Sequence, residues 1–596
     1  MTRAATPAAA GPDPAAATAA ASGETAPLLA GTSDRAAHDV EAGASVPRTS
    51  WARARRATVT VLAAATITSA LAILVVLIFG APAALIPGDT PAPPITEPEP
   101  APAPPVRPRK RNLVMMVSDG FGPASETFGR TMYAVLTNSS IAATPLDKLL
   151  VGQSRTRSTS SLVTDSAAGA TAFSCAQKSY NGAIAVTADQ RPCATVLEAA
   201  AAMGYKTGLV VTSRITHATP ASFNAHVLWR DYENDIAEQQ VHGVVGLPTT
   251  DLMLGGGRRH FLPQTHKESV RDDDRDLLAE ARSRGFSVLT TRSDFDADWH
   301  LPTLGVFTPD HMAFDLDRNL AKEPSLAEMA QRALEVLDKA VEDDDETPGF
   351  FLMVEGSRID MAAHSNDPGA HAHDIAMYYR TVEVVKQWVD AHWESTVMVS
   401  TSDHETGGLS LARQVSAKYP EYKWNPLTVA KQRKSAHYVG KQILALEKRS
   451  PKHVTNLIAD LFGITDLTPA ELAYLTSPVR TLSDLEYFLG DTVVSTRAEL
   501  GWATHGHSAV DVNLYAHGQG IDALRGNVEN TDVGKFLHEY LGVGEVMTEL
   551  TQLMRANVTF KHPMMPPPKG EPGLVMAGMG KVESDEVEWA RMAGHF

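Results

Sequence analysis

Side chains of the types that can bind metal ions or phosphate follow four short apolar runs in the sequence. The runs cover residues 113–117, 207–212, 350–354 and 396–400, and the polar residues soon after them are Asp119, Thr219, Glu355, Asp360, Asp403 and His404. Continuous apolar strands are typical of a parallel sheet with helices on both faces, and such sheets bind ligands outside the carboxyl ends of their strands. One polar residue after a strand is explained by a turn, but four such ends together indicate a site.

The residue types at these ends suit two kinds of metal ion. Zinc accepts histidine nitrogen and carboxylate oxygen, whereas magnesium prefers carboxylate, hydroxyl and water oxygens. Asp360 and His364 are spaced so that a helix would place both side chains on one face, where they could hold one ion together. The alternative is a solvated helix face with a weak ion pair. Asp403 and His404 are adjacent, which suits a loop better than a helix.

Ser166 is the candidate nucleophile. It follows Thr164 and Asp165 and precedes the small residues 167–170, which can start a helix tightly. At a helix N-terminus the free amides and the helix dipole attract phosphate. For an isolated serine, a simple helix cap is the commoner role. The sequence contains no G-x-S-x-G elbow, which argues against a serine esterase of the α/β-hydrolase type.

Six segments carry these candidate residues. They are Val117-Ser-Asp-Gly-Phe-Gly, Thr164-Asp-Ser-Ala-Ala-Gly-Ala-Thr, His217-Ala-Thr-Pro, Glu355-Gly-Ser-Arg-Ile-Asp with His364, Thr401-Ser-Asp-His-Glu-Thr-Gly-Gly, and Thr504-His-Gly-His-Ser-Ala-Val-Asp. Together, in this order, they resemble the alkaline phosphatase family over nearly all of residues 111–560. The likeness is greatest to the fungal vacuolar type.

The resemblance implies a site with two zinc ions, one magnesium ion and Ser166 as the nucleophile. The ligands that it implies for the first zinc are Asp360, His364 and His507. Those for the second zinc are Asp119, Asp403 and His404, and those for magnesium are Asp119, Thr219 and Glu355. Arg230 stands at the family's position for the arginine that holds phosphate, and a planar guanidinium can contact two phosphate oxygens at once.

Two details of this assignment stay open. The family spacing favours His507 over His505 as the zinc ligand, which leaves His505 as a neighbour of unassigned role. Around the third metal, bacterial relatives carry Asp and Lys and animal relatives carry two His, whereas this chain has His217 and Met361. The preference of that site for magnesium, zinc or cobalt is therefore undetermined.

The implied reaction is the hydrolysis of small phosphate monoesters to alcohol and inorganic phosphate through a phosphoserine, with a broad substrate range. Two alternatives remain: a phosphodiesterase of the same superfamily, and an inactive membrane glycoprotein. A sulfatase is disfavoured because residues 164–168 lack its C-x-P-x-R or S-x-P-x-R motif. The family resemblance further implies a homodimer. The net charge of -17 argues against nucleic acid as a partner.

The chain divides into five parts, with an α/β catalytic domain at the centre. We expect a disordered cytoplasmic tail at 1–56, a transmembrane signal-anchor helix at 57–79 and a proline-rich linker at 80–110. The catalytic domain would span 111–562, with an inserted subdomain at 409–500, and a flexible tail would follow at 563–596. In that domain a mostly parallel sheet would be flanked by helices on both faces.

The flanks of the apolar segment predict its orientation. Arg53, Arg55 and Arg56 precede it, so the positive-inside rule places the catalytic domain in a lumen or outside the cell, as in a single-pass type II membrane protein. Glu24 and the pair Leu28-Leu29 resemble an acidic dileucine sorting signal. We expect the vacuole membrane, with the cell surface as second choice.

Two modifications are suggested on the lumenal side. Asn138-Ser-Ser and Asn557-Val-Thr are glycosylation sequons. Cys175 and Cys193 could form a disulfide or could both be small buried residues, and their spacing does not decide between these alternatives.

Overall fold

The computed structural model describes residues 110–563 except 141–142, 246–249 and 420. The predicted tail, membrane segment and sorting signal lie outside the described residues, as do nearly all of the linker and of the C-terminal tail. Within the described part, no helix combines the length and apolar character needed to cross a membrane.

A ten-stranded sheet organises the domain, with the strand order β12-β2-β11-β8-β1-β7-β3-β4-β6-β5. Its four central strands are β8 (Thr396–Thr401), β1 (Asn112–Val117), β7 (Phe350–Glu355) and β3 (Lys206–Arg214). The others are β2 (Leu150–Arg155), β4 (Leu252–Gly256), β5 (Ser287–Leu289), β6 (Thr303–Val306), β11 (Val512–His517) and β12 (Gly526–Glu529). Neighbouring strands are parallel, except that β11 is antiparallel to both β8 and β2. The prediction of a mostly parallel sheet is confirmed.

The four strands predicted from apolar runs are these four central strands, and they lie side by side. Val117 pairs with both Glu355 of β7 and Thr401 of β8, so the carboxyl ends of three strands are level. The chain leaves β1 toward Asp119 and leaves β8 toward Asp403. The register therefore brings polar residues from distant parts of the sequence to one edge of the sheet.

Helices cover both faces of the sheet, because alternate residues of each strand point to opposite sides. Val114 and Met116 pack in one apolar cluster, while Leu113, Met115 and Val117 pack in the other. The first cluster includes residues of α2 (Pro123–Leu136), α9 (Leu326–Glu342) and α11 (Pro368–Ala391). The second includes residues of α3 (Ser166–Cys175), α4 (Val196–Ala202), α5 (Ala218–Asn224), α6 (Glu233–His242), α7 (Leu277–Ser283), α18 (Asn530–Leu541) and α19 (Gly544–Asn557).

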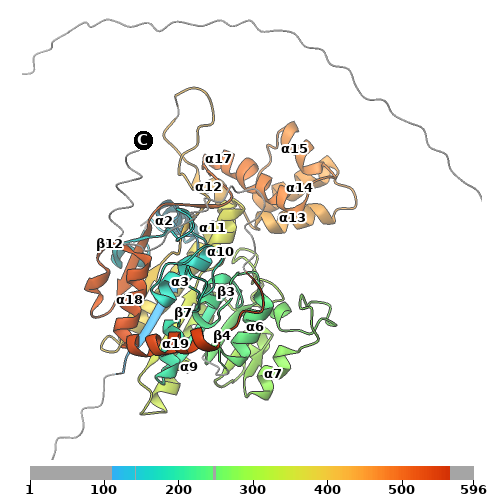
Figure 1. Ribbon diagram of the computed structural model, residues 1–596. Helices are drawn as coiled ribbons and strands as arrows, with labels where there is room; N and C mark the ends of the chain where they lie inside the picture. The colour runs from blue at the N-terminus through green and yellow to red at the C-terminus, as the bar shows by residue number, and fades with distance from the viewer. Residues whose placement is uncertain (1–109, 141–142, 246–249, 420, 564–596) are drawn as a thin grey trace, which may run out of the picture. The chain divides into compact units, whose positions relative to one another are not determined.

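A group of helices lies between two short strands, β9 (Glu405–Thr406) and β10 (His507–Ser508), which pair with each other. The helices are α12 (Pro426–Val429), α13 (Ala436–Ala445), α14 (Pro451–Phe462), α15 (Pro469–Thr476), α16 (Leu482–Tyr487), a π-helix (Phe488–Ser495) and α17 (Thr496–Ala498). Figure 1 shows α13, α14 and α15 grouped together, and residues between 436 and 494 form their own apolar cluster. The boundaries 409–500 of an inserted subdomain stay a prediction.

Short elements complete the fold. They are α8 (Arg292–Asp296), α10 (Arg358–His364) and the 3-10 turns Pro145–Lys148, Arg258–His260 and Ile521–Leu524. Cys175, the last residue of α3, is disulfide-bonded to Cys193, so the disulfide alternative is the one that the structure supports. Asn138 and Asn557 are both exposed, as a glycosylation acceptor must be, and their modification stays a prediction.

Candidate active site

Two groups of acidic and histidine side chains meet at the carboxyl edge of the sheet. In each group, three ligand atoms lie within 4.8 Å of one another. We call one the outer group, which consists of Asp360, His364 and His507. We call the other the buried group, which consists of Asp119, Asp403 and His404. The structure thus brings together six of the predicted metal ligands in the two sets in which they were predicted.

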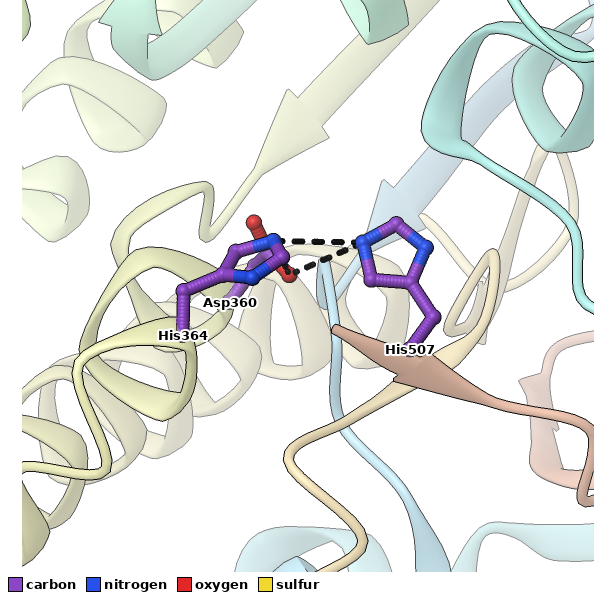
Figure 2. Close-up of side chains that lie close together, drawn as sticks. All are labelled: Asp360, His364 and His507. Carbon is purple, nitrogen blue, oxygen red and sulfur yellow. Dashed lines mark hydrogen bonds and ion pairs between the residues drawn. The ribbon is translucent and has the colours of Figure 1, made fainter. Parts of the chain in front are cut away.

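The outer group joins α10 to β10 (Figure 2). Nε2 of His364 lies 3.3 Å from Oδ1 of Asp360, and Nε2 of His507 lies 3.7 Å from the same oxygen. The two Nε2 atoms are 3.2 Å apart. Each ring donates its other N–H to a backbone carbonyl, His364 to His505 at 2.5 Å and His507 to Thr164 at 2.7 Å. These bonds turn both Nε2 atoms toward Asp360, so that each ring in its neutral form can offer Nε2 to a cation.

The buried group lies beside the hydroxyl of Ser166, which His404 contacts. Nε2 of His404 lies 3.2 Å from Oδ2 of Asp403 and 3.6 Å from Oδ1 of Asp119. The same nitrogen lies 3.1 Å from Oγ of Ser166, the first residue of α3. Asp165 caps this helix by accepting a hydrogen bond from the amide of Ala168. The serine hydroxyl therefore lies at a helix N-terminus and within hydrogen-bond distance of one candidate metal ligand, His404.

Several buried polar atoms at this edge lack a hydrogen-bond partner among the described residues. They are both carboxylate oxygens of Asp119, Oδ2 of Asp403, Oε1 of Glu355, Oγ1 of Thr219 and Nδ1 of His217. A buried polar atom without a partner is costly, so native proteins rarely leave one. Divalent cations would satisfy the oxygen atoms, since carboxylate and hydroxyl oxygens are ligands for zinc or magnesium. The donor set therefore fits the metals that the sequence predicts.

The charges of the buried carboxylates also indicate that cations bind at this site. Burial raises the pKa of Asp119 well above its usual range, and the neighbouring charges of Asp403 and Asp360 raise it further. Burial also raises the pKa of Asp403 to about 7 and that of Glu355 to about 7. So many carboxylates can ionise together only when positive charge lies between them.

Arg230 lies beside the nucleophile. Its Nη1 donates to Oδ2 of Asp165 at 3.0 Å, and its Nη2 lies 3.0 Å from Nε2 of His217. Asp165 also accepts a hydrogen bond from the amide of Gly182 at 2.9 Å. The guanidinium is thus anchored next to the start of α3, where it could contact a phosphate bound to Ser166.

Sequence reasoning missed two residues of the site, Thr406 and His311. Oγ1 of Thr406 donates to Oδ1 of Asp360 at 2.6 Å and lies 3.2 Å from Nδ1 of His404. Its position within the 401–408 motif was the available signal. His311, which no motif marks, packs against His217 with ring centroids 5.2 Å apart.

Met361 was expected beside the third metal together with His217. Its sulfur accepts a hydrogen bond from Nη1 of Arg358 at 2.8 Å. Its side chain packs against the apolar cluster that includes Phe314. The side chain that packs against the ring of His217 is that of His311, which lies in the loop after β6.

Comparisons with known proteins show which family the chain resembles. A sequence model of the family described as alkaline phosphatase matches residues 110–543. The alkaline phosphatase of Schizosaccharomyces pombe is 44% identical over 448 residues, which cover 74% of this chain and 83% of that protein. The repressible alkaline phosphatase of Saccharomyces cerevisiae is 43% identical over 482 residues, covering 75% of this chain and 84% of that protein.

A solved structure shows the same fold. The cold-active alkaline phosphatase from a psychrophilic Shewanella species superposes with a TM-score of 0.62 at 30% identity. The match covers 72% of this chain and 99% of that one.

Proposed function

The chain belongs to the alkaline phosphatase family and is an enzyme that hydrolyses phosphate monoesters, and on that premise we propose that Ser166 is the nucleophile of a site with two zinc ions and one magnesium ion. The family depends on metals, and the chain carries matching groups of ligands. The observation that carries the proposal is the 3.1 Å separation between Oγ of Ser166 and Nε2 of His404, a member of the buried group.

Each ion has a proposed set of ligands. Asp360, His364 and His507 would hold the first zinc, and Asp119, Asp403 and His404 the second. Asp119, Thr219 and Glu355 would hold magnesium, and the unpartnered oxygens of these three residues support that assignment. The other oxygen of Glu355, Oε2, accepts hydrogen bonds from Ser357 at 2.6 Å and Ser213 at 3.3 Å. These bonds fix the carboxylate, and so they fix the direction in which the unpartnered Oε1 points.

The contact between Arg230 and His217 favours magnesium at the third position. A guanidinium has only donors, so Nε2 of His217 accepts and Nδ1 of that neutral ring carries the proton. Burial, and then the charge of Arg230, lower the pKa of His217 well below its usual value, which keeps the ring neutral. A ring N–H cannot ligate a cation. This favours magnesium, which keeps water ligands, over zinc or cobalt, which bind imidazole nitrogen readily.

The residues of the chain supply the steps of the reaction. Arg230 and the amides at the start of α3 bind the phosphoryl oxygens and orient phosphorus toward Ser166. The Ser166 oxygen forms a bond to phosphorus while the bond to the alcohol oxygen breaks, and the alcohol leaves with a proton. Water then cleaves the phosphoserine, which releases inorganic phosphate and restores the hydroxyl. Bound metal ions would neutralise the phosphate charge and lower the pKa of the serine hydroxyl.

A substitution of the nucleophile tests the proposal. Ser166→Ala should lower the turnover of an aryl phosphate by roughly 10³-fold or more, while zinc content and phosphate binding remain at the level of the parent. Turnover at the parent rate would show that Ser166 is not the nucleophile. Zinc and magnesium should be found at two and one per chain by elemental analysis.

The same preparation separates the alternatives. Parent protein should hydrolyse an aryl monoester faster than the matching diester, and a chelator should abolish the activity. A faster rate on the diester would identify a phosphodiesterase. Absence of both zinc and turnover would indicate the inactive glycoprotein.

We also propose the cellular setting that the sequence predicts. The chain would be a homodimer anchored by a single N-terminal helix, with its catalytic domain in the vacuole lumen or, as second choice, outside the cell. Imaging of a fluorescent fusion with Leu28 and Leu29 changed to alanine tests the sorting signal, and unchanged vacuolar delivery would rule it out. Light scattering of the purified protein tests the dimer.

A further inference from the structure

A stacked pair of rings lies beside the outer group. Tyr487, the last residue of α16, stacks on His505 with ring centroids 3.9 Å apart and an interplanar angle of 20°. Tyr487 comes from the helices between β9 and β10, and 38% of its surface is exposed. His505 comes from the segment that leads into β10, two positions before the proposed zinc ligand His507.

His505 in turn is bound to His364 by two hydrogen bonds. Its backbone carbonyl accepts the Nδ1–H of His364 at 2.5 Å, and its own Nδ1–H donates to the backbone carbonyl of His364 at 2.8 Å. The first of these bonds sets the tautomer and the ring plane of His364. In metal sites such a carbonyl partner orients the histidine and raises its affinity for the ion.

The same helical segment contacts the residues that follow His364. Oγ of Ser365 lies 3.4 Å from Oε2 of Glu486, the neighbour of Tyr487. A side chain at Gly490 of the π-helix would come within 2.6 Å of the Asn366 carbonyl, so the two backbones are in close contact. Nδ2 of Asn366 donates to the Thr504 carbonyl at 3.0 Å. The residues after α10 are therefore in contact with the α16 and π-helix segment on one side and hydrogen-bonded to the segment before β10 on the other.

We propose that Tyr487 is a positioning residue for the outer cation site. Its ring fixes His505, and the carbonyl of His505 fixes His364 with Nε2 toward Asp360 and His507. The inference rests on the proposed zinc site, and it gives the helices between β9 and β10 a role in metal binding. Tyr487 itself contacts neither the cation nor the phosphate.

The first experiment measures zinc affinity in the full chain. Tyr487→Ala should lower the affinity of the outer site for zinc by up to about tenfold, the low end of the effect of losing a ligand's own hydrogen-bond partner, because the carbonyl of His505 is still present. Tyr487→Phe should bind zinc like the parent, because the ring that stacks is retained. Zinc occupancy is followed by competition with a coloured chelator, with unfolding temperature recorded for each variant.

Tyr438→Ala is the matched control. Tyr438 lies on α13 of the same helical segment with 37% of its surface exposed, and its ring lies near the ammonium of Lys434 at 5.1 Å. Its loss should leave zinc affinity unchanged. At saturating zinc, Tyr487→Ala should recover kcat, since the ligands themselves are intact.

A double-mutant cycle with His505→Ala completes the test. If Tyr487→Ala does not fold, the single variant His505→Ala, which removes the other ring of the stack, replaces it and should lower zinc affinity as well. The two substitutions should be strongly non-additive in zinc affinity, because each removes the same stacked contact. Parent-like zinc affinity in Tyr487→Ala, or additive effects in the cycle, would overturn the inference. A parent chain that binds no zinc would instead overturn the proposed function.

Discussion

The two candidate cation groups differ most in their contact with solvent. The side chains of Asp119, Asp403 and His404 are 0% exposed, whereas His364 is 36% and His507 12% exposed. The buried group lies at the ends of the central strands β1 and β8, and the outer group comes from α10 and β10. On the proposed mechanism, the buried group would position the nucleophile and the alcohol of the substrate would leave past the outer group, which is the side that faces solvent.

The groups also differ in electrostatics. Burial raises the pKa of Asp403 to about 7, and the charge of Asp360 contributes. Burial also opposes ionisation of Asp360, but the charges of His364 and His507 outweigh it and hold the pKa of Asp360 well below its usual range. Asp360 in turn raises the pKa of His364 to about 9. Without metal, the outer group is therefore an ion pair between Asp360 and His364, whereas the buried group holds carboxylates that need an added positive charge.

The largest expected effect is the loss of activity when one carboxylate ligand of either group is replaced. Asp403→Asn and Asp360→Asn should each lower kcat/KM by roughly 10³-fold or more, because a bound cation contributes several kcal/mol to the transition state. Elemental analysis should show that each variant loses the cation of its own group. Loss of all metal from Asp360→Asn would show that the groups do not bind independently.

The second-largest expected effect is on activity, when Thr406, the residue that links the two groups, loses its hydroxyl. The hydroxyl of Thr406 contacts Asp360 of the outer group and His404 of the buried group. Thr406→Val should lower activity by about ten- to a hundredfold, since it removes an outer partner of both ligands without changing the shape of the side chain. Thr406→Ser keeps the hydroxyl and should retain most activity. Equal activities of the two variants would show that the hydroxyl does not matter.

A smaller difference is expected in the rate of metal loss. A chelator should remove the cation of the outer group before that of the buried group, because only the outer group is open to solvent. Zinc release should therefore occur in two phases, with activity lost in the first. Restoration of activity by one equivalent of zinc after that phase would confirm the order, and a single phase would contradict it.

The smallest effect concerns the stability of metal-free protein. An acid with a raised folded pKa stabilises the fold below its unfolded pKa, and that contribution is lost as the pH rises through the folded value. For Asp403 this window runs from 3.8 to about 7. Metal-free Asp403→Asn should therefore unfold at a higher temperature than the metal-free parent above about pH 7, with a difference that shrinks toward about pH 4.

Asp360→Asn should behave in the opposite way. Its lowered folded pKa means that the ionised form stabilises the fold above 3.8, and this contribution is lost as the pH falls toward the folded value. The metal-free variant should unfold at a lower temperature than the parent at neutral pH. Melting curves that shift in the same direction for both variants would remove the electrostatic distinction between the groups.

Local patterns were enough to predict much of the site. The apolar runs identified the four central strands, since a fully buried strand must be apolar throughout. The position of Asp119 after β1 and of Asp403 after β8 followed from those strands. The spacing of Asp360 and His364 matched one turn of a helix, which the structure has as α10.

The sequence by itself determined the strands, the ligand types and the motif around Ser166, because each depends on neighbouring residues. Only the tertiary structure decided that Cys175 and Cys193 are bonded, that Thr406 joins the two groups and that Tyr487 stacks on His505. These contacts join segments whose approach is set by the packing of whole helices on the sheet. No local spacing encodes that packing, so such partners are found only when the chain is folded.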